Sequence, residues 1–261
     1  MYKIVAIDLD GTMLNQYGIV TDETKQAIQK TIEKGTDVII ASGRPIDSIK
    51  TIAKEIDSKN YFIAGNGALI YDIQKDKIIY ENYLSKQKVL KIAKICEENS
   101  ISYNIYTEET IITKQLKYNV LYYYKENLKK EEKNKTSITL VEDIIEYIKN
   151  TENNKFLKIT ICEETQSIFN SVIRKIKQIS DIDVLDVSHM SRKVIKQGTE
   201  EINVEYYYTE ISTTGADKWT AIQYLINKLK IEKDEVIAIR WQYEWQNNDR
   251  KCRTRNSDGR E

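Results

Sequence analysis

The sequence has few cysteines, a single histidine and no long apolar run. Its three cysteines, Cys96, Cys162 and Cys252, lie far apart and show no C-x-x-C spacing. We therefore expect structural thiols rather than a disulfide framework or a zinc site. The only histidine, His189, is expected to be a loop or surface residue. No apolar run approaches the ~18 residues of a membrane helix, and the N-terminus lacks the apolar segment of a signal peptide, so we expect a cytoplasmic protein.

The sequence also lacks an excess of charge of either sign, because the 261 residues hold 40 basic and 40 acidic side chains. A net charge of zero gives no global field, so we expect neither nucleic acid nor a membrane as a partner. One proline and nine glycines occur beside many lysines, isoleucines and asparagines, a bias that AT-rich coding explains. The tyrosine runs at residues 122–124 and 206–208 have no basic track beside them, so they are interpreted as strand residues.

Two aspartates follow a short apolar run at the start of the chain. Residues 4–7 are Ile-Val-Ala-Ile, which predicts a buried strand. The chain then continues with Asp8, Leu9, Asp10, Gly11 and Thr12. The glycine allows a sharp turn, so both carboxylates can lie near one cation while backbone N–H groups face an anion. This pattern suits phosphate chemistry at the carboxyl edge of a sheet. The alternative is a polar exit from a strand, since Asp and Gly are common turn residues.

The next residues alternate between helix and strand patterns. A helix is predicted from residue 21 to about 34, a strand at 37–41, a helix to about 56 and a third strand at 61–64. Two successive strand–helix units favour a parallel sheet. Residues 69–71 and 78–80 are predicted to form a hairpin.

The sequence pattern changes near residue 82 and changes back near residue 207. Between these points we expect a helix at 87–99, a strand at 156–162 and a solvated loop in the charged stretch 125–135. After residue 207 a helix from 218 to about 230 and a strand at 235–239 are predicted. The sequence therefore predicts a doubly wound α/β parallel-sheet core, residues 1–82 and 207–261, with an inserted α+β domain at 83–206.

The D-x-D-G-T motif after a strand resembles the haloacid dehalogenase (HAD) superfamily of hydrolases. The inserted block resembles the cap of its Cof-type branch (subfamily IIB), which closes over the core and selects the substrate. The resemblance implies Mg²⁺-dependent hydrolysis of small phosphate monoesters, such as sugar phosphates or phosphorylated cofactors. It makes Asp8 the nucleophile that forms an aspartyl phosphate and Asp10 the acid/base. Both would also bind Mg²⁺.

Further site residues follow from the same resemblance. Ser42 matches the family's phosphate-binding hydroxyl, with the flexible Gly43 and Arg44 beside it. Lys218 matches the lysine that neutralises the attacking carboxylate and the phosphoryl group. Outside this context, Ser42 would be interpreted as a turn residue and Lys218 as a surface lysine.

Two residues near these positions complete the expected site, and a third departs from the family pattern. The backbone N–H of Leu9 is expected to bind phosphate. Asn66, in Gly-Asn-Gly, is a candidate on the substrate side, although the same sequence also fits a tight turn. Trp219 departs from the family, which usually has a small residue after the lysine, and it could crowd the pocket.

The tail also departs from the family. After the strand at 235–239 the family has Gly-Asp-x-x-Asn-Asp, whose acids complete the Mg²⁺ site, whereas here Arg240 opens a polar segment without apolar periodicity. If Arg240 is encoded by AGG, and Trp241 and Trp245 by TGA, which a variant genetic code reads as tryptophan, the nucleotides read one base later can encode Gly-Asp-Asn-Met-Asn-Asp and later Ala-Met-Gly. The alternative is a divergent C-terminus in which Glu244 or Asp249 supplies the metal ligand.

Three functions therefore remain open. The chain is a working phosphatase, an impaired truncated relative that at most binds phosphorylated ligands, or a sugar phosphomutase. In each case the expected partner is a small phosphorylated metabolite. The oligomeric state and the identity of the substrate do not follow from the sequence.

We predict a one-nucleotide frame change near codon 240, with residues 240–261 translated from the shifted frame. The physical reason is that a buried strand of a parallel sheet needs a following helix to cover it, and the polar segment offers no apolar face. Sequencing the gene across codons 236–262 tests this prediction. Ordinary TGG codons for the two tryptophans would place glycine where the shifted frame otherwise has aspartate. If no frame there encodes Gly-Asp-x-x-Asn-Asp or this glycine-containing form, the tail is a genuine divergent C-terminus.

Overall fold

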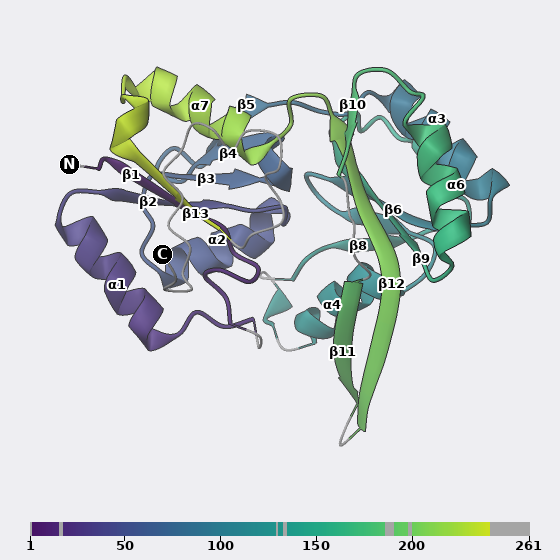
Figure 1. The fold of residues 1–261 in the computed structure, drawn as a ribbon, viewed down its shortest axis with the longest axis horizontal. Coiled ribbons are helices and arrows are strands. Elements are labelled where there is room, and N and C mark those ends of the chain that lie inside the picture. Colours follow the sequence, from purple (N-terminus) through teal and green to yellow (C-terminus); the bar gives the residue numbers. More distant parts are fainter. Residues whose placement is uncertain are drawn as a thin grey trace. The chain divides into compact units, whose positions relative to one another are not determined.

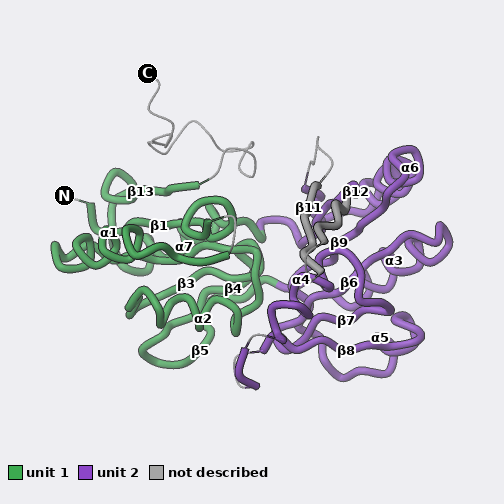
Figure 2. Tube along the Cα trace, turned by 90° about the horizontal axis from the view of Figure 1, so that it is seen from below, with its two compact units in different colours: residues 1–82, 216–261 green, residues 83–215 purple. Residues whose placement is uncertain are grey.

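The chain divides into two compact units in a computed structural model, which describes residues 2–15, 18–128, 130–132, 135–185, 191–197 and 200–240. Unit 1 comprises residues 1–82 and 216–261, and unit 2 comprises residues 83–215 (Figure 2). The sequence pattern placed the second boundary at residue 207. The structure differs because residues 207–213 belong to strand β12 (Glu200–Thr213), which pairs with β9 (Phe156–Glu163) of unit 2. His189, Cys252 and the tail 241–261 lie outside the described residues.

Unit 1 alternates strands and helices along most of its length. Its elements are β1 (Ile4–Ile7), α1 (Asp22–Glu33), β2 (Asp37–Ala41), α2 (Ile46–Glu55), β3 (Tyr61–Ala64), the short 3₁₀ helix η1 (Gly65–Gly67), β4 (Leu69–Asp72), β5 (Lys77–Glu81), α7 (Lys218–Leu229), the 3₁₀ helix η3 (Lys233–Glu235) and β13 (Val236–Ile239). In the described part of the chain, its sheet has the order β13-β1-β2-β3-β4-β5. The first four strands run parallel, and β4 and β5 add to them antiparallel.

Helices cover both faces of this sheet (Figure 1). Successive side chains of a strand point to opposite faces, so Ile4 and Ala6 of β1 share one face. There they form a buried cluster with Trp219 and Ile222 of α7. Helices α1 and α2 lie on the other side of the sheet in Figure 1. The predicted doubly wound α/β core is confirmed.

Unit 2 has an α+β arrangement. Its remaining elements are α3 (Lys86–Glu98), β6 (Ser102–Thr107), β7 (Ile111–Thr113), α4 (Tyr118–Asn127), β8 (Ile138–Leu140), α5 (Ile144–Asn150), α6 (Gln166–Ile176), β10 (Ile182–Val184) and β11 (Ser191–Gln197). The strand order is β10-β12-β9-β6-β7-β8, and β11 pairs with β12. The pairs are antiparallel except for the parallel pair β7–β8. Apolar side chains of α3, α5 and α6 form a buried core with β6, β9 and β12.

The tyrosine run at residues 122–124 corrects a prediction. These residues belong to helix α4, not to a strand, and the helix also includes part of the stretch that was expected to be a solvated loop. Two ring contacts hold α4 against the sheet: Tyr123 lies 6.4 Å from Tyr106 of β6, and Tyr118 lies 4.7 Å from Tyr206 of β12, measured between ring centroids. Aromatic residues favour strands only on average, and here tertiary packing overrides that preference.

The two described cysteines are free and buried. Burial raises the pKa of the Cys96 thiol well above its usual range, which keeps the group protonated and weakly nucleophilic. Among the described residues, no helix is long and apolar enough to cross a membrane.

Candidate active site

The carboxyl ends of three parallel strands meet at one edge of the unit 1 sheet. Asp8 and Asp10 follow β1, Ser42 follows β2, and η1 follows β3. Lys218 is the first residue of α7. This edge therefore gathers residues that are distant in the sequence, including Asp8 and Lys218, which are 210 positions apart.

Asp8 and Lys218 form a buried ion pair. The Lys218 Nζ atom lies 2.8 Å from Asp8 Oδ1, and the two side chains are only 6% and 8% exposed. The same carboxylate oxygen accepts a hydrogen bond from the backbone N–H of Leu9 at 2.9 Å. Removing two charges from water is costly, so such a pair persists only with close contact and further hydrogen bonds, as found here. The Asp8 carboxylate is therefore held in one orientation.

Asp10 forms a second ion pair, with Arg44. The guanidinium donates two parallel hydrogen bonds, from Nε to Oδ2 at 3.0 Å and from Nη2 to Oδ1 at 2.8 Å. Arg44 is buried and also donates from Nη1 to Ser48 Oγ at 3.3 Å. The Asp10 side chain, in contrast, is 63% exposed. Arg44 was expected on the substrate side, whereas in this structure its guanidinium binds the Asp10 carboxylate in a bidentate manner.

The loop after β2 is tied to η1. The Ser42 side chain is buried, and its Oγ accepts a hydrogen bond from the backbone N–H of Arg44 at 3.2 Å. The backbone N–H of Asn66 donates to the Ser42 carbonyl at 3.0 Å, and that of Gly65 donates to the Arg44 carbonyl at 3.2 Å. Gly43 lies between these anchored residues and is half-buried. The expected phosphate-binding loop and the Asn66 turn therefore form one hydrogen-bonded unit.

Trp219 packs away from the charged pair. It is 6% exposed and belongs to the cluster between α7 and the sheet. Its indole also faces the Lys233 ammonium, 5.0 Å from the ring centroid. The departure from the family at this position is accommodated in the core, because the helix turns the side chain after Lys218 toward the sheet.

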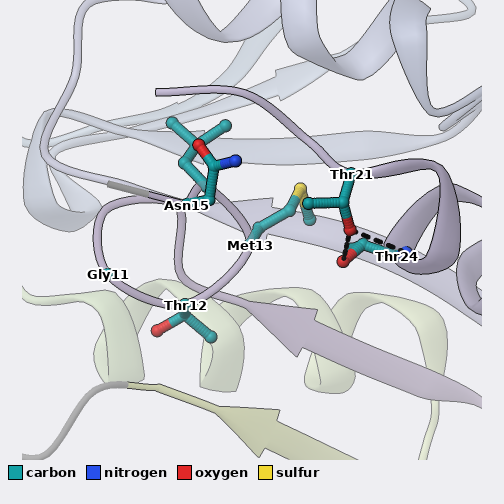
Figure 3. Close-up of a pocket in the computed structure, with 7 residues that line it drawn as sticks. Gly11, Thr12, Met13, Asn15, Thr21 and Thr24 are labelled. Atoms are coloured by element: carbon teal, nitrogen blue, oxygen red, sulfur yellow. Dashed lines mark hydrogen bonds between the residues drawn. The ribbon is translucent and has the colours of Figure 1, made fainter. Parts of the chain in front are cut away.

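A hollow of about 420 Å³ lies beside the loop that follows β1 (Figure 3). It is lined by Gly11, Thr12, Met13, Leu14, Asn15, Thr21 and Thr24. The Thr21 and Thr24 hydroxyl oxygens are 3.0 Å apart, and Thr21 caps α1 by accepting from the Thr24 backbone N–H. The described lining residues include neither carboxylate nor Lys218, so the hollow is distinct from the two ion pairs.

The described residues offer the type of donor atom that Mg²⁺ prefers, but too few of these donors to complete its coordination. The Asp8 carboxylate and the backbone carbonyl of Asp10 are the hard oxygen donors that this ion prefers. Within the described residues, however, no group of three or more His, Cys, Asp and Glu side chains could hold a metal. The alternative ligands Glu244 and Asp249 lie outside the described residues.

Two residues have roles at this site that the sequence analysis did not assign to them. Asp217 caps α7, because its Oδ1 accepts from the backbone N–H groups of Trp219 and Thr220, both at 2.9 Å. An aspartate directly before a predicted helix is a recognisable cap signal. Gly67 lies against the backbone of this cap. Its flanking sequence indicates a turn but gives no sign of that contact.

Comparison with known proteins identifies the family. The haloacid dehalogenase-like hydrolase family matches residues 5–239, so the chain belongs to this family. The match ends at the last residue of β13.

Individual relatives are named as candidate phosphatases. Bacillus subtilis YxeH is 25% identical over 92% of this chain and 80% of its own length. A Buchnera aphidicola relative is 39% identical over 95 residues, so this chain spans about a third of that protein (34%).

Among solved structures, a haloacid dehalogenase-like hydrolase from B. subtilis has a TM-score of 0.73 at 20% identity, covering 92% of this chain and 84% of that one. A sugar phosphatase of HAD subclass IIB has a TM-score of 0.66 at 18% identity, covering 91% and 80%.

We predict that Asp8 and Lys218 are strongly coupled in stability. Lys218→Met leaves the carboxylate buried without its cation, and Asp8→Asn leaves the ammonium buried without its anion. Each single variant should lower the free energy of unfolding by about 3–5 kcal/mol. The double variant removes both charges and should lose less than the sum of the two losses. Urea unfolding followed by circular dichroism measures all three variants.

The control is Lys25→Met, which breaks the surface pair between Lys25 and Glu55, whose side chains are 29% and 40% exposed. It should change stability little, because water already solvates both charges. Losses at Asp8 and Lys218 that simply add would contradict the predicted coupling.

Proposed function

We propose that this protein is a phosphatase that hydrolyses small phosphate monoesters through an aspartyl-phosphate intermediate. The observation that carries the proposal is the Asp8 carboxylate, buried at the end of β1 and held by Lys218 Nζ at 2.8 Å. A carboxylate fixed in one orientation can attack phosphorus with little loss of entropy. The membership of the haloacid dehalogenase-like hydrolase family supports this chemistry.

In the first step an Asp8 oxygen forms a bond to phosphorus, and the bond to the ester oxygen breaks. Asp10 donates a proton to the departing alkoxide, which leaves as the alcohol. In the second step Asp10 accepts a proton from water, whose oxygen attacks the same phosphorus. The Asp8–phosphorus bond breaks and inorganic phosphate leaves. Lys218 offsets negative charge in both steps, and the Ser42 hydroxyl with the Gly43 backbone binds the phosphoryl oxygens. The Leu9 N–H, which donates to Asp8 Oδ1 in this structure, must leave that carboxylate before it can bind them too.

The pairing of Asp10 with Arg44 sets a condition on this cycle. Two hydrogen bonds from a guanidinium favour the carboxylate form, whereas the first step needs the protonated acid. Asp10 must therefore leave Arg44 before it acts. Its 63% exposure allows this rotation, while Arg44 stays in place through Ser48. Arg44 can then donate to a phosphoryl oxygen of the substrate.

We propose Mg²⁺ as the cofactor, held by the Asp8 carboxylate and the Asp10 backbone carbonyl. When bound, it supplies positive charge to the phosphoryl oxygens. Because the described residues offer no third acid, water must fill the remaining positions and the affinity should be low.

We further propose that unit 2 is the cap domain and that it selects among phosphorylated metabolites. Sugar phosphates and phosphorylated cofactors are the candidates. A structural neighbour is named as a sugar phosphatase, and a shorter B. subtilis match is named 5-amino-6-(5-phospho-D-ribitylamino)uracil phosphatase. We place the activity in the cytoplasm.

The alternative is a relative that binds phosphorylated ligands without turning them over. The absence of a third acid among the described residues favours it. It predicts retained binding of a phosphate ligand without release of phosphate.

We predict that activity depends on both aspartates. Release of phosphate from p-nitrophenyl phosphate with Mg²⁺ should be lost in Asp8→Asn, which cannot form the acyl phosphate. It should fall by about 10²–10⁴-fold in Asp10→Asn, which cannot transfer the proton. Asp57→Asn, at an exposed position outside the site, is the matched control and should keep full activity. Turnover by Asp8→Ala would rule out the aspartyl-phosphate mechanism.

We predict that activity rises with Mg²⁺ only at roughly millimolar concentrations or above, because the described donors leave the ion mostly hydrated. A titration of the initial rate with MgCl₂, at constant ionic strength, measures this dependence. Saturation well below millimolar concentrations would mean that a further acidic group of the chain binds the metal.

A further inference from the structure

Gly67 brings the backbone of η1 very close to the start of α7. It lies in η1 with φ of +100°, and a Cβ atom placed on it would lie 2.1 Å from the carbonyl oxygen of Asp217. The same atom would lie 2.2 Å from the Asp217 carbonyl carbon and 2.8 Å from the backbone nitrogen of Lys218. All three neighbours are backbone atoms, so no change of rotamer relieves the overlap. Any side chain at this position must push η1 and the start of α7 apart.

The backbone that Gly67 touches carries the lysine of the ion pair. Asp217 is the cap of α7, and Lys218 is the first residue of the helix. Real Cβ atoms essentially never approach other heavy atoms within 3.0 Å, so the two segments would separate by about 1 Å. If the packed Lys218 side chain moves with its backbone, a shift of that size lengthens the 2.8 Å contact between Lys218 Nζ and Asp8 Oδ1 beyond hydrogen-bonding distance.

Both α7 and η1 are held in place by other contacts, so neither can move without disturbing its neighbours. Helix α7 is fixed by Trp219, Ile222 and Leu225 in the core cluster. On the other side, η1 is hydrogen-bonded to the loop after β2 through Asn66 and Gly65. The strain of a side chain at residue 67 would therefore act on Lys218 or on the Ser42 loop.

We propose that Gly67 is a positioning residue of the reaction: its lack of a side chain lets η1 contact the start of α7, and this contact sets Lys218 at bonding distance from Asp8. The catalytic consequence rests on the proposed phosphatase function, whereas the geometric consequence does not. Gly67 touches no reacting atom and acts only through the placement of Lys218.

The alternative is that Gly67 serves only the positive φ of the turn. Two comparisons separate these roles. Gly35 has a φ of +81°, and a Cβ atom placed on it would meet nothing within 4 Å, so Gly35→Ala carries backbone strain without overlap. Asparagine tolerates positive φ better than alanine does, so Gly67→Asn should restore function if φ were the only demand.

The experiment measures acetylation of lysine side chains by limiting acetic anhydride, with mass spectrometry as the readout. Lys228, exposed in the last turn of the same helix, is the internal reference. In the starting protein, the ion pair should protect Lys218. Gly67→Ala and Gly67→Asn should both raise its labelling relative to Lys228 by about 10-fold or more, whereas Gly35→Ala should not. If a variant is partly unfolded, sucrose, which is excluded from the protein surface, is added before labelling to restore the compact state.

Turnover of p-nitrophenyl phosphate gives the second readout. Gly67→Ala should lower kcat by about 10²-fold, as expected for a displacement near 1 Å, with a smaller change in KM. Gly35→Ala should leave kcat unchanged. Unchanged Lys218 labelling in Gly67→Ala, or normal labelling in Gly67→Asn, would overturn the proposal. If the protein shows no turnover at all, the phosphatase function fails and the labelling alone decides the role of Gly67.

Discussion

The buried contact between Asp8 and Lys218 is the interaction on which the candidate site depends. Both charges are removed from water, so their stability requires that each find the other at hydrogen-bonding distance. That requirement fixes the end of β1, the start of α7 and the packing of this helix on the sheet at once. The apolar cluster around Trp219 holds the helix, and η1 determines how close its first turn comes. The apolar packing of α7 and the backbone contact between Gly67 and Asp217 together place the Lys218 charge against Asp8.

The two aspartates of the first loop have opposite surroundings. Asp8 is enclosed and meets a compact ammonium, whereas Asp10 is exposed and meets a planar guanidinium. A buried carboxylate cannot reorient, and an exposed one can exchange partners at small cost. Two carboxylates whose environments differ in this way are suited to different chemical roles. In the proposed reaction the fixed group attacks phosphorus and the movable group carries the proton.

Local sequence patterns predicted the elements of unit 1, whereas the resemblance to the family was needed to identify Ser42 and Lys218 among the residues that meet at its edge. The apolar runs before Asp8 and before Ser42 are buried strands, and parallel pairing brings their ends together. The pairing of Arg44 with Asp10 could not be predicted, because it depends on how two loops face each other. Residues 122–124 were assigned wrongly, since the preference of tyrosine for strands is weaker than the packing of α4. The boundary at residue 207 was misplaced because strand β12 continues across that position and pairs with β9 of unit 2.

The insertion of unit 2 between β5 and α7 has a consequence for the order of folding during synthesis. Strand β1 is synthesised well before its neighbour β13 and before Lys218, the partner of Asp8. Contacts of such long sequence separation form slowly, because a large loop must close before they contribute. Unit 2 is a contiguous segment and can fold while β1 still lacks one neighbour. The nascent sheet of unit 1 therefore stays incomplete until unit 2 has been synthesised, a state in which an unpaired strand is exposed to association with other chains.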